Sequence, residues 1–342
     1  MNLPKVLILA PIQHDFPPKG YGPWELISYN LCEELVKMGV EVTVFATKSA
    51  KTRAKLLAFW EEPVDEKSID SDSKNLIHIS EAIKVAKDFD IVHNHLNIHP
   101  VLFAKLLGVR MVTTLHGAGC ERKNKPYHEY LKEENYVSIS YAEREFAPYL
   151  NYVENVYNGV DFNKYEISEG KGEYLLFSGR ITKEKGIEDA IELSKRTGFP
   201  LKIAGIITDA EYYRKTVEPN LSPGKIEYLG NLAYTEYVPV LKKAAATLFL
   251  ISWDEPFGLS IVDSLASGVP AIGYPRGAFP ELVFDNRMGI IVNNLDEAAD
   301  AVKNLTSFNP VEVRNLAFDK FSADKMAKGY LEVYKKLLAD KL

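Results

Sequence analysis

The fold class can be inferred from residues 247–270, which read TLFLISWDEPFGLSIVDSLASGVP. The apolar run Thr247–Ile251 predicts a buried strand, and Pro256 with Gly258 marks the start of a helix that ends at Gly268. The apolar face of this predicted helix consists of Leu259, Val262, Leu265 and Ala266. A buried strand followed directly by an amphipathic helix is typical of a parallel sheet covered by helices.

The same alternation of short β-branched runs with longer amphipathic stretches continues through the whole chain. We therefore expect an α/β protein with two doubly wound parallel sheets. In the first half the candidate strands are Val6–Ala10, Val42–Ala46, Ile91–His93, Met111–Thr114, Val137–Ser140 and Val153–Tyr157. In the second half they are Leu175–Ser178, Leu201–Ala204, Ile226–Leu229, Thr247–Ile251, Ala271–Gly273 and Ile290–Val292. Sheets of this kind bind ligands at the carboxyl ends of their strands.

The chain length of 342 residues suggests about two domains. The polar, glycine-containing stretch 166–173 is predicted to be a linker, which gives an N-terminal domain over residues 1–165 and a second domain over residues 166–320. The final segment, residues 321–342, contains the stretch Ala323–Ala339, which is predicted to be an amphipathic helix. The apolar stripe of that helix consists of Met326, Tyr330, Val333, Leu337 and Leu338.

Composition excludes several classes of protein. The net charge of −6 argues against a dedicated nucleic-acid binder, so any anion site must be local. The two cysteines, Cys32 and Cys120, form no CxxC pair, and neither a disulfide framework nor a structural zinc site is expected. No run approaches the ~18 apolar residues of a membrane span. The apolar segment Val6–Ala10 is too short for a signal peptide, and we expect a cytoplasmic protein.

Two carboxylates flank the start of the helix that follows strand 247–251. Glu255 precedes the helix and Asp263 lies in its second turn, so the two could bind two groups of hydroxyls. The N–H groups of Phe257–Leu259 have no partner within the helix and could bind a phosphate. The alternative interpretation makes Glu255 a dipole-stabilising cap and Asp263 a solvated side chain.

Two cations follow the predicted strand 175–178. Arg180 and Lys185 come just before a helix expected to begin near Gly186. A guanidinium fork and a mobile ammonium group suit a diphosphate leaving group that gains negative charge as its bond breaks. The alternative is a pair of solvated surface charges, although lysines at a helix start are unfavourable unless an anion is present.

Glycine-containing turns follow two further strands. Residues 20–25 read GYGPWE, in which Gly22 and Pro23 suit the start of a helix whose N–H groups face an anion or a sugar oxygen. A dinucleotide-binding fingerprint is absent, because Glu25 stands at the third glycine position and Thr47 and Lys48 replace an acidic ribose ligand. A second turn, 276–281, carries Glu281. Both stretches also fit a simple turn.

Seven stretches, in this order along the chain, resemble the retaining nucleotide-sugar glycosyltransferases of family 4. They are residues 20–25, 91–95 (IVHNH), 113–117 (TTLHG), 156–161 (VYNGVD), 179–186 (GRITKEKG), 255–263 (EPFGLSIVD) and 277–281 (GAFPE). The resemblance implies the GT-B architecture, in which two Rossmann-like domains face a central cleft. It also implies that the last helix crosses back to the N-terminal domain and that the cleft closes by a hinge movement.

The resemblance assigns roles to residues of this sequence. It implies that Glu255 contacts the donor hexose, that Asp263 contacts the ribose, and that His116 lies beside the hexose. Arg180 and Lys185 match the diphosphate-binding pair, so His116, Glu255, Arg180 and Lys185 are the candidate catalytic residues. The other candidate donor-binding residues are Gly22, Pro256, Phe257, Gly258 and Leu259, and the acceptor-side candidates are Tyr21, Trp24 and Glu25.

Two positions depart from the family pattern. The family commonly has Glu where Asp263 stands, and commonly has Gly-Gly before the Glu of its N-terminal loop, where this chain has Gly22-Pro23-Trp24-Glu25. With Asp at position 263, a ribose contact requires a bridging water or a small backbone shift.

The expected function is transfer of a hexose from a UDP- or GDP-hexose to a hydroxyl acceptor, with retention of configuration. The acceptor is a glycan, a small molecule or a lipid-linked sugar, and neither a cofactor nor a metal is expected. A nucleotide-sugar epimerase and a binding-only protein are alternatives. A metal-dependent hydrolase is a further alternative, because the spacing of His93, His95 and His99 could supply ligands.

Contact with a membrane surface is a minority hypothesis. Basic residues between Lys48 and Lys55 precede Leu56, Leu57, Phe59 and Trp60, which could form a basic amphipathic surface for anionic lipid. Because Glu61 and Glu62 follow at once, we favour a solvated loop and the start of a helix.

Overall fold

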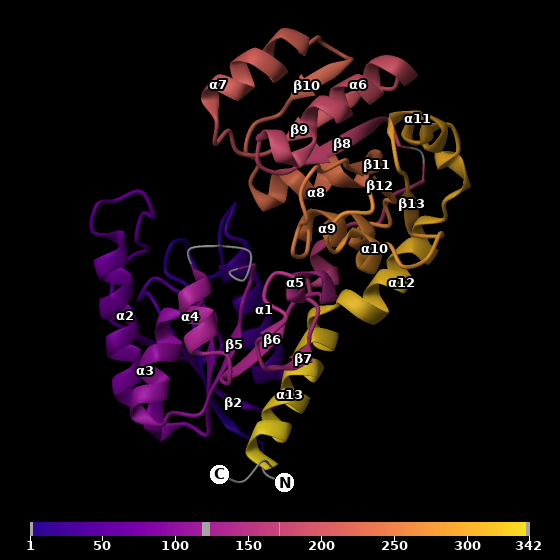
Figure 1. Cartoon of the computed structure of the whole chain (residues 1–342). Helices are drawn as coiled ribbons and strands as arrows, with labels where there is room; N and C mark the ends of the chain where they lie inside the picture. Colours follow the sequence, from indigo (N-terminus) through magenta and orange to yellow (C-terminus); the bar gives the residue numbers. More distant parts are fainter. Residues whose placement is uncertain (1–2, 118–123, 171, 340–342) are drawn as a thin grey trace. The chain divides into compact units, whose positions relative to one another are not determined.

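The structure, a computed structural model, describes residues 3–117, 124–170 and 172–339. Contacts divide the chain into two compact units (Figure 1). Unit 1 comprises Met1–Gly159 together with Ala323–Leu342, and unit 2 comprises Val160–Ser322. The polar stretch 166–173 therefore lies within unit 2, a few residues after the point where the chain enters it.

In the described part of unit 1, seven parallel strands form one sheet in the order β3-β2-β1-β4-β5-β6-β7. The strands are β1 (Lys5–Leu9), β2 (Glu41–Ala46), β3 (Lys55–Ala58), β4 (Ile91–Asn94), β5 (Met111–Thr114), β6 (Asn135–Ser138) and β7 (Tyr152–Asn155). The helices are α1 (Pro23–Lys37), α2 (Ser71–Val85), α3 (His99–Leu107), α4 (Lys125–Tyr130), α5 (Tyr141–Arg144) and α13 (Ala323–Ala339).

In the described part of unit 2, six parallel strands form a second sheet in the order β10-β9-β8-β11-β12-β13. The strands are β8 (Tyr174–Ser178), β9 (Leu201–Ala204), β10 (Ile226–Tyr228), β11 (Ala244–Phe249), β12 (Ala271–Gly273) and β13 (Gly289–Ile291). The helices are α6 (Ile187–Thr197), α7 (Ala210–Tyr212), α8 (Tyr234–Lys242), α9 (Leu259–Ala266), α10 (Phe279–Leu282), α11 (Leu295–Lys303) and α12 (Pro310–Phe321). Two parallel α/β sheets are the predicted fold class.

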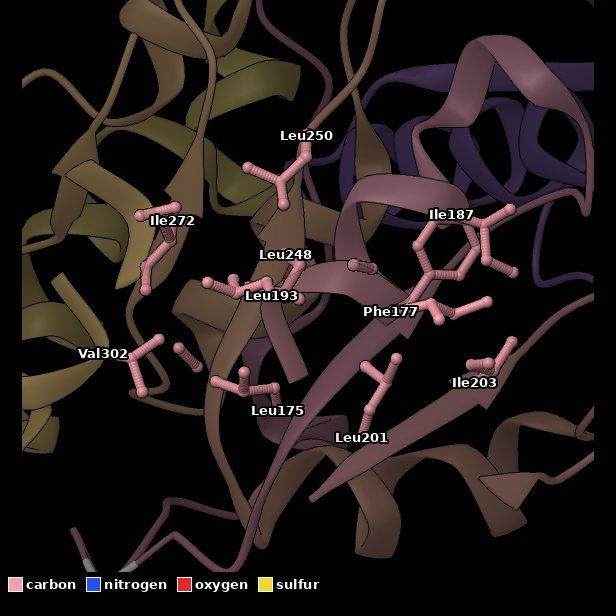
Figure 2. Close-up of a cluster of buried hydrophobic side chains, with 14 of the residues drawn as sticks. Leu175, Phe177, Ile187, Leu193, Leu201, Ile203, Leu248, Leu250, Ile272 and Val302 are labelled. Atoms are coloured by element: carbon pink, nitrogen blue, oxygen red, sulfur yellow. The ribbon is translucent and has the colours of Figure 1, made fainter. Parts of the chain in front are cut away.

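The core of unit 2 explains why its strands read as nearly continuous apolar runs. Side chains of β8, β9, β11 and α6 meet in one buried cluster (Figure 2). Two neighbouring strands, β8 and β9, contribute side chains that are at most 2% exposed: Leu175, Phe177, Leu201 and Ile203. Because helices cover both faces of a parallel sheet, both faces of each central strand must be apolar.

The strand order creates one switch point in each sheet. The chain runs outward from β1 through β2 and β3 and then returns to the other side of β1 as β4. In unit 2 it leaves β8 toward β9 and β10 and returns as β11. The loops after the two strands at a switch point diverge, which leaves room for a ligand at the carboxyl edge. The loops after β8 and β11 contain the predicted cations and Glu255.

The last helix of the described chain completes unit 1. Helix α13 packs against α1, and its span Ala323–Ala339 is the predicted one (Figure 1). Its buried residues include Met326, Tyr330, Val333 and Leu337 of the predicted stripe. Tyr334 is also fully buried, and its hydroxyl is satisfied there by a hydrogen bond with His93 of β4.

The expectation of a loop and helix start after β2 is wrong for residues 55–58, which form strand β3. Leu56 and Leu57 pair in register with Val44 and Phe45 of β2. The strand lies at the sheet edge and its apolar residues are only half-buried, so it lacks the strong pattern of the central strands.

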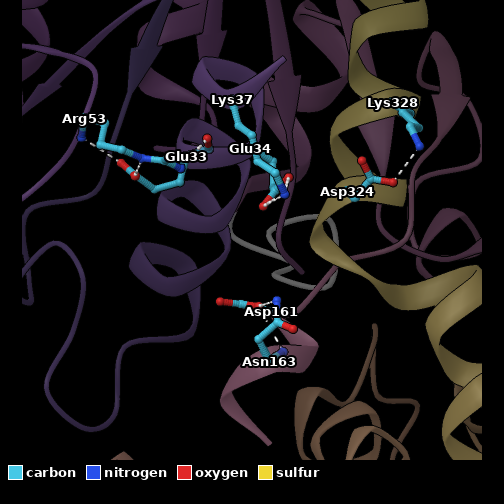
Figure 3. A network of polar contacts seen from close by, with 8 residues as sticks. All are labelled: Glu33, Glu34, Lys37, Arg53, Asp161, Asn163, Asp324 and Lys328. Carbon is cyan, nitrogen blue, oxygen red and sulfur yellow. Dashed lines mark hydrogen bonds and ion pairs between the residues drawn. The ribbon is translucent and has the colours of Figure 1, made fainter. Parts of the chain in front are cut away.

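Nearby basic side chains are engaged in ion pairs. Arg53 Nε donates to Glu33 Oε2 of α1 at 2.6 Å (Figure 3), and Lys48 pairs with Glu61 at 2.5 Å. The segment that the minority hypothesis treated as a basic amphipathic surface therefore contains a strand, and two of the basic side chains before it are paired with carboxylates. In the described residues, no helix is both long enough and apolar enough to cross a membrane.

Candidate active site

Two predicted site residues of unit 2 contact each other directly. Lys185 Nζ and Glu255 Oε2 form an ion pair, and the two side chains are 14% and 17% exposed. Lys185 also lies over the ring of Trp253, 5.0 Å from its centroid. The pair joins the loop after β8 to the loop after β11. Glu255 is therefore paired with a neighbouring cation and does not act only as a helix cap.

Two close backbone approaches hold these loops in place. Gly186 has φ +74°, and a Cβ there would lie 1.8 Å from the carbonyl oxygen of Leu250. Gly277 has φ +52°, and a Cβ there would lie 2.3 Å from the backbone of Glu255. The next residue, Ala278, donates its N–H to the Glu255 carbonyl at 2.9 Å. The glycine turn at 276–281 therefore supports the Glu255 loop from behind.

Arg180 lies at the same edge of the sheet. The residue is half-buried and follows β8 after one glycine, Gly179. Its guanidinium group forms no hydrogen bond and no ion pair with any other residue that the structure describes. A half-buried guanidinium of this kind is available to an anionic ligand.

Helix α9 begins beside the Glu255 loop. Its N-cap is Gly258, which has no side chain to cap the helix, and no acidic residue lies in the first turn. The N-terminal partial positive charge is thus not offset by a local carboxylate. An eight-residue helix with this start can bind an anion such as phosphate. Pro256, Phe257 and Leu259 are adjacent to this terminus.

Asp263, in the second turn of α9, is not a solvated side chain. Its Oδ1 accepts a hydrogen bond from the Tyr165 hydroxyl at 2.5 Å. Burial raises the pKa of Asp263 to about 7, and the Tyr165 hydrogen bond opposes that rise. The alternative of a solvated Asp263 is therefore wrong. Sequence reasoning did not find Tyr165, because 98 positions separate it from Asp263.

In unit 1, the loop 20–25 starts helix α1. Gly22 is the N-cap and Pro23 is the first helical residue. Glu25 is 2% exposed, and its Oε1 accepts the backbone N–H of His14 at 3.1 Å. Burial raises the pKa of Glu25. Glu25, a predicted acceptor-side residue, is therefore a buried anchor of the loop. Other residues of the loop form its exposed surface.

The aromatic residues of this loop are placed differently. Tyr21 is 47% exposed and meets the His14 ring edge-to-face at 5.9 Å. The Trp24 ring stacks on the His116 ring, with centroids 5.9 Å apart and planes 22° from parallel. Residues after β1 and after β5 thus meet at the carboxyl edge of the first sheet. Two predicted site residues, Trp24 and His116, are in contact.

His116 belongs to a buried network of uncharged groups. Its Nε2 lies 2.8 Å from His95 Nδ1, and burial lowers the pKa of His116 to about 3. Burial also lowers the pKa of His95 well below its usual value. His116 has φ +48°, a backbone conformation that is rare for residues other than glycine. A strained, neutral histidine at a strand end is typical of a functional site.

The network continues to the last helix. His93 Nδ1 lies 2.7 Å from the Tyr334 hydroxyl, and His93 Nε2 lies 2.8 Å from Thr114 Oγ1. Thr114 Oγ1 in turn lies 2.7 Å from the Tyr330 hydroxyl. Helix α13 is thereby hydrogen-bonded to β4 and β5, the strands that carry the histidines.

Glu143 fixes the His116 loop from the other side. Its Oε1 accepts the Gly117 N–H at 2.5 Å, and its Oε2 accepts the Ile139 N–H at 2.9 Å. The side chain is fully buried, which raises the pKa of Glu143 to about 7. Sequence reasoning missed this residue. The only available signal was the capping pattern of Ser140 and Glu143 at the start of α5.

The residues of the metal-hydrolase alternative are used differently. Both ring nitrogens of His93 have protein partners, and His99 packs edge-to-face on Tyr127. In the described part of the chain, no group of three or more His, Cys, Asp or Glu is placed to hold a metal ion. Cys32 is buried with a free thiol, and Cys120 lies outside the described residues.

A hollow of about 800 Å³ lies beside these loops in unit 2. Its lining includes Lys183, Asp189, Arg196, Tyr274 and Arg276, but none of Arg180, Lys185, Glu255 and Asp263. Tyr274 donates its hydroxyl to Asp189 at 2.6 Å across the floor of this hollow. The hollow borders the candidate site, because Gly186 and Ser252, on the two loops that carry Lys185 and Glu255, also line it.

The fold and these two strand-edge clusters define a two-domain α/β protein of the GT-B class. Comparison with known families identifies it further. The profile described as Glycosyltransferase Family 4 matches residues 25–163, and the profile described as Glycosyl transferases group 1 matches residues 161–314. The chain belongs to this family of glycosyltransferases.

Individual relatives agree with this assignment. The uncharacterized glycosyltransferase MJ1178 of Methanocaldococcus jannaschii is 27% identical over 77% of this chain and 80% of its own length. The sucrose-phosphate synthase of Thermosynechococcus elongatus superposes with a TM-score of 0.79 at 16% identity, covering 98% of this chain and 100% of its own. HepE of Anabaena, solved with UDP and glucose, gives 0.74 at 14% identity, covering 97% and 99%. The likeness to solved structures confirms the predicted GT-B fold.

Proposed function

We propose that this glycosyltransferase moves a hexose from a nucleoside diphosphate sugar to a hydroxyl acceptor, with retention of configuration and without a metal ion. The main support is the cluster at the β8/β11 switch point of unit 2. There a half-buried Arg180, the Lys185–Glu255 pair and the uncapped start of α9 lie on two loops, one after β8 and one after β11, the neighbouring strands of the switch point. Two cations and a helix N-terminus suit a diphosphate, and a carboxylate suits sugar hydroxyls.

In this proposal each group has one task. Arg180, Lys185 and the N–H groups at Phe257–Leu259 stabilise the negative charge that develops on the departing diphosphate. Glu255 accepts hydrogen bonds from the donor hexose once the diphosphate binds Lys185. Asp263 accepts a hydrogen bond from the ribose. His116 is neutral and the Trp24 ring stacks on it, and the family resemblance assigns it a role beside the donor hexose.

Transfer proceeds by attack on the same face that the leaving group departs from. The acceptor oxygen forms a bond to the anomeric carbon while the bond from that carbon to the β-phosphate oxygen breaks. The bonding electron pair leaves with the nucleoside diphosphate, and the acceptor proton passes to the departing phosphate oxygen. No nucleophilic carboxylate and no metal ion enters these steps.

The first experiment identifies the nucleotide base of the donor. HepE of Anabaena was solved with UDP, which supports testing UDP first. A thermal-shift panel of UDP, GDP, ADP and dTDP, with magnesium and again with a chelator, should show stabilisation by one nucleotide that survives chelation. A shift abolished by the chelator, or no shift with any nucleotide, would contradict the proposal.

Turnover then separates transfer from the alternatives. The stabilising nucleotide is supplied as its hexose conjugate with a panel of glycans, small sugars and lipid-linked sugars. Release of free nucleoside diphosphate that depends on an acceptor supports transfer. An isomerised donor without release would favour an epimerase, and donor binding without any turnover would favour a binding-only protein.

A further inference from the structure

Tyr165 is rigidly held next to Asp263. It is 5% exposed and directly follows a 3₁₀ turn, Phe162–Lys164, in unit 2. The guanidinium of Arg314, on α12, donates to the Tyr165 carbonyl at 3.2 Å and to the Phe162 carbonyl at 2.6 Å. The Arg314 side chain thus fixes the backbone at both ends of the 3₁₀ turn. The Tyr165 hydroxyl donates a hydrogen bond to Asp263 Oδ1 at 2.5 Å.

The other groups around Asp263 are uncharged or already engaged. Tyr234 and Tyr237, on α8, have buried hydroxyls with no hydrogen-bond partner among the described residues. Burial raises the pKa of each, and the negative charge of Asp263 adds to the rise. The Tyr234 ring meets the Tyr165 ring edge-to-face at 5.6 Å. Arg314, on α12, also donates to the Ala266 carbonyl and lies over the Phe162 ring, and in the described residues its hydrogen-bond acceptors are all backbone carbonyls.

Among the described residues, the Asp263 carboxylate therefore has a single hydrogen-bond donor, the Tyr165 hydroxyl. Burial raises the pKa of Asp263 to about 7, and the Tyr165 hydroxyl is the one group that lowers it. Oδ1 is occupied by this hydrogen bond, whereas Oδ2 has no partner in the described chain. Two buried tyrosine hydroxyls in the same place also lack partners. Asp263 Oδ2 and these two hydroxyls are therefore available to form hydrogen bonds with the polar groups of a ligand.

We propose that Tyr165 is a positioning residue for donor binding, which holds Asp263 as an anion and directs its Oδ2 toward the hydroxyls of the donor ribose. The inference rests on the proposed function, in which Asp263 binds the ribose. Tyr234 and Tyr237 supply further hydroxyls for the nucleoside. Tyr165 touches no substrate itself and acts only through Asp263.

The inference predicts a pH dependence with a defined sign. An ionised Asp263 accepts the ribose hydrogen bond, so nucleotide affinity of the wild-type protein should decline as the pH falls through about 7. Tyr165→Phe removes the hydrogen bond that favours the anion, so the pKa of Asp263 rises further. The midpoint of the affinity profile should move up by about one to two pH units. Affinity should recover at high pH.

The test measures nucleotide Kd by calorimetry between pH 6 and 9.5, using the full chain and whichever of UDP, GDP, ADP and dTDP stabilises the wild type. Tyr174→Phe is the matched control, because its hydroxyl also makes one hydrogen bond in unit 2, to the Val240 carbonyl at 2.7 Å. It should leave the midpoint unchanged. At high pH and saturating donor sugar, Tyr165→Phe should regain the wild-type kcat, while its KM near neutral pH is raised.

Asp263→Asn provides an independent variant should Tyr165→Phe fail to fold. It should bind the nucleotide weakly and without a midpoint near neutral pH. A midpoint that persists in Asp263→Asn, or a Tyr165→Phe profile that superposes on the wild type, overturns the inference while leaving the proposed function intact. Absence of nucleotide binding by the wild type at every pH overturns the proposed function itself.

Discussion

Lys185 and Glu255 form an ion pair across 70 positions of sequence, although both were predicted to contact the donor. Each side chain offsets the charge of the other while no donor is bound. Under the proposed function, a nucleoside diphosphate competes for Lys185, because a diphosphate carries more charge than one carboxylate. We therefore expect donor binding to release Glu255 for the sugar, so that donor binding and release of the carboxylate are one event.

Replacement of Glu255 tests the catalytic assignment. Glu255→Gln keeps the size of the side chain but removes its charge, so transfer should fall by about 100-fold or more. Folding should be retained, because the side chain has the ion pair to Lys185 as its main contact. Initial rates at saturating donor measure the effect, with Glu192→Gln, an exposed residue of α6 paired to Arg196, as the control. A fully active Glu255→Gln protein would contradict the assignment.

Arg180 should affect binding without affecting stability. Arg180→Ala removes a guanidinium with no hydrogen-bond or ion-pair partner among the described residues, so the melting temperature should stay within about 1–2 °C of the wild type. The nucleotide Kd should rise about tenfold or more, because a charge-assisted phosphate contact is lost. Arg196→Ala serves as the control, because Arg196 pairs with Glu192 and Asp296. An unchanged Kd in Arg180→Ala would exclude a diphosphate contact.

Glu143 should control activity through the His116 loop. In Glu143→Gln, an amide N–H must face the N–H of Gly117 or of Ile139, so one of the two hydrogen bonds is lost. The free energy of unfolding should fall by about 1–3 kcal/mol. Transfer should fall about tenfold, whereas the nucleotide Kd, which depends on unit 2, should not change. The exposed Glu145→Gln is the control, and a Glu143→Gln protein with wild-type kcat would rule out this positioning role.

Unit 1 should lose stability as the pH falls below about 6.5. Burial lowers the pKa of five of its histidines, to about 4 for His78, to about 3 for His93 and His116, well below the usual value for His95, and below the usual value for His128. The unfolded chain takes up protons on these side chains below about pH 6.5 and the folded unit does not, so acid favours unfolding. The slope is up to about 1.4 kcal/mol per pH unit for each excess proton.

Two carboxyl groups of the same unit act in the opposite direction. Burial raises the pKa of Glu143 to about 7 and also raises the pKa of Glu25, so each binds a proton more readily in the folded state and adds stability that is lost as the pH rises. The histidines outnumber them, and a net loss on acidification is expected. Calorimetry at pH 5, 6 and 7 measures it, and His78→Asn should reduce the slope. Stability that is constant or greater at pH 5 would be inconsistent with neutral buried histidines.

The sequence pattern was sufficient to predict the elements with strong apolar periodicity. The bounds of α13, β5 and β9 are the predicted ones. Their buried positions must be apolar, so the apolar periodicity of these elements is clear in the sequence. Strands β6 and β7 begin earlier than predicted, at Asn135 and Tyr152, where polar or aromatic residues precede the apolar run. Edge strand β3 was missed because its side chains are only half-buried.

The candidate site shows the same division. Residues at strand ends, such as Arg180 and Glu255, could be selected because a chemical type and a position in the sheet are both readable locally. Tyr165 and Glu143 could not, since each acts through a tertiary contact. The Tyr165 hydroxyl reaches a carboxylate 98 positions away, and Glu143 accepts an N–H 26 positions away. Such pairs have no periodicity for a sequence pattern to reveal.

The hydrogen bonds from Tyr330 and Tyr334 to Thr114 and His93 have a consequence for how the protein is made. Unit 1 is built from both ends of the described chain, whereas unit 2 is one continuous segment between them. During synthesis unit 2 can fold as soon as Ser322 has emerged, but β4 and β5 wait for α13 to supply its tyrosines. The first sheet to be synthesised is thus the last to be completed, and until then His93 and Thr114 lack their tyrosine partners.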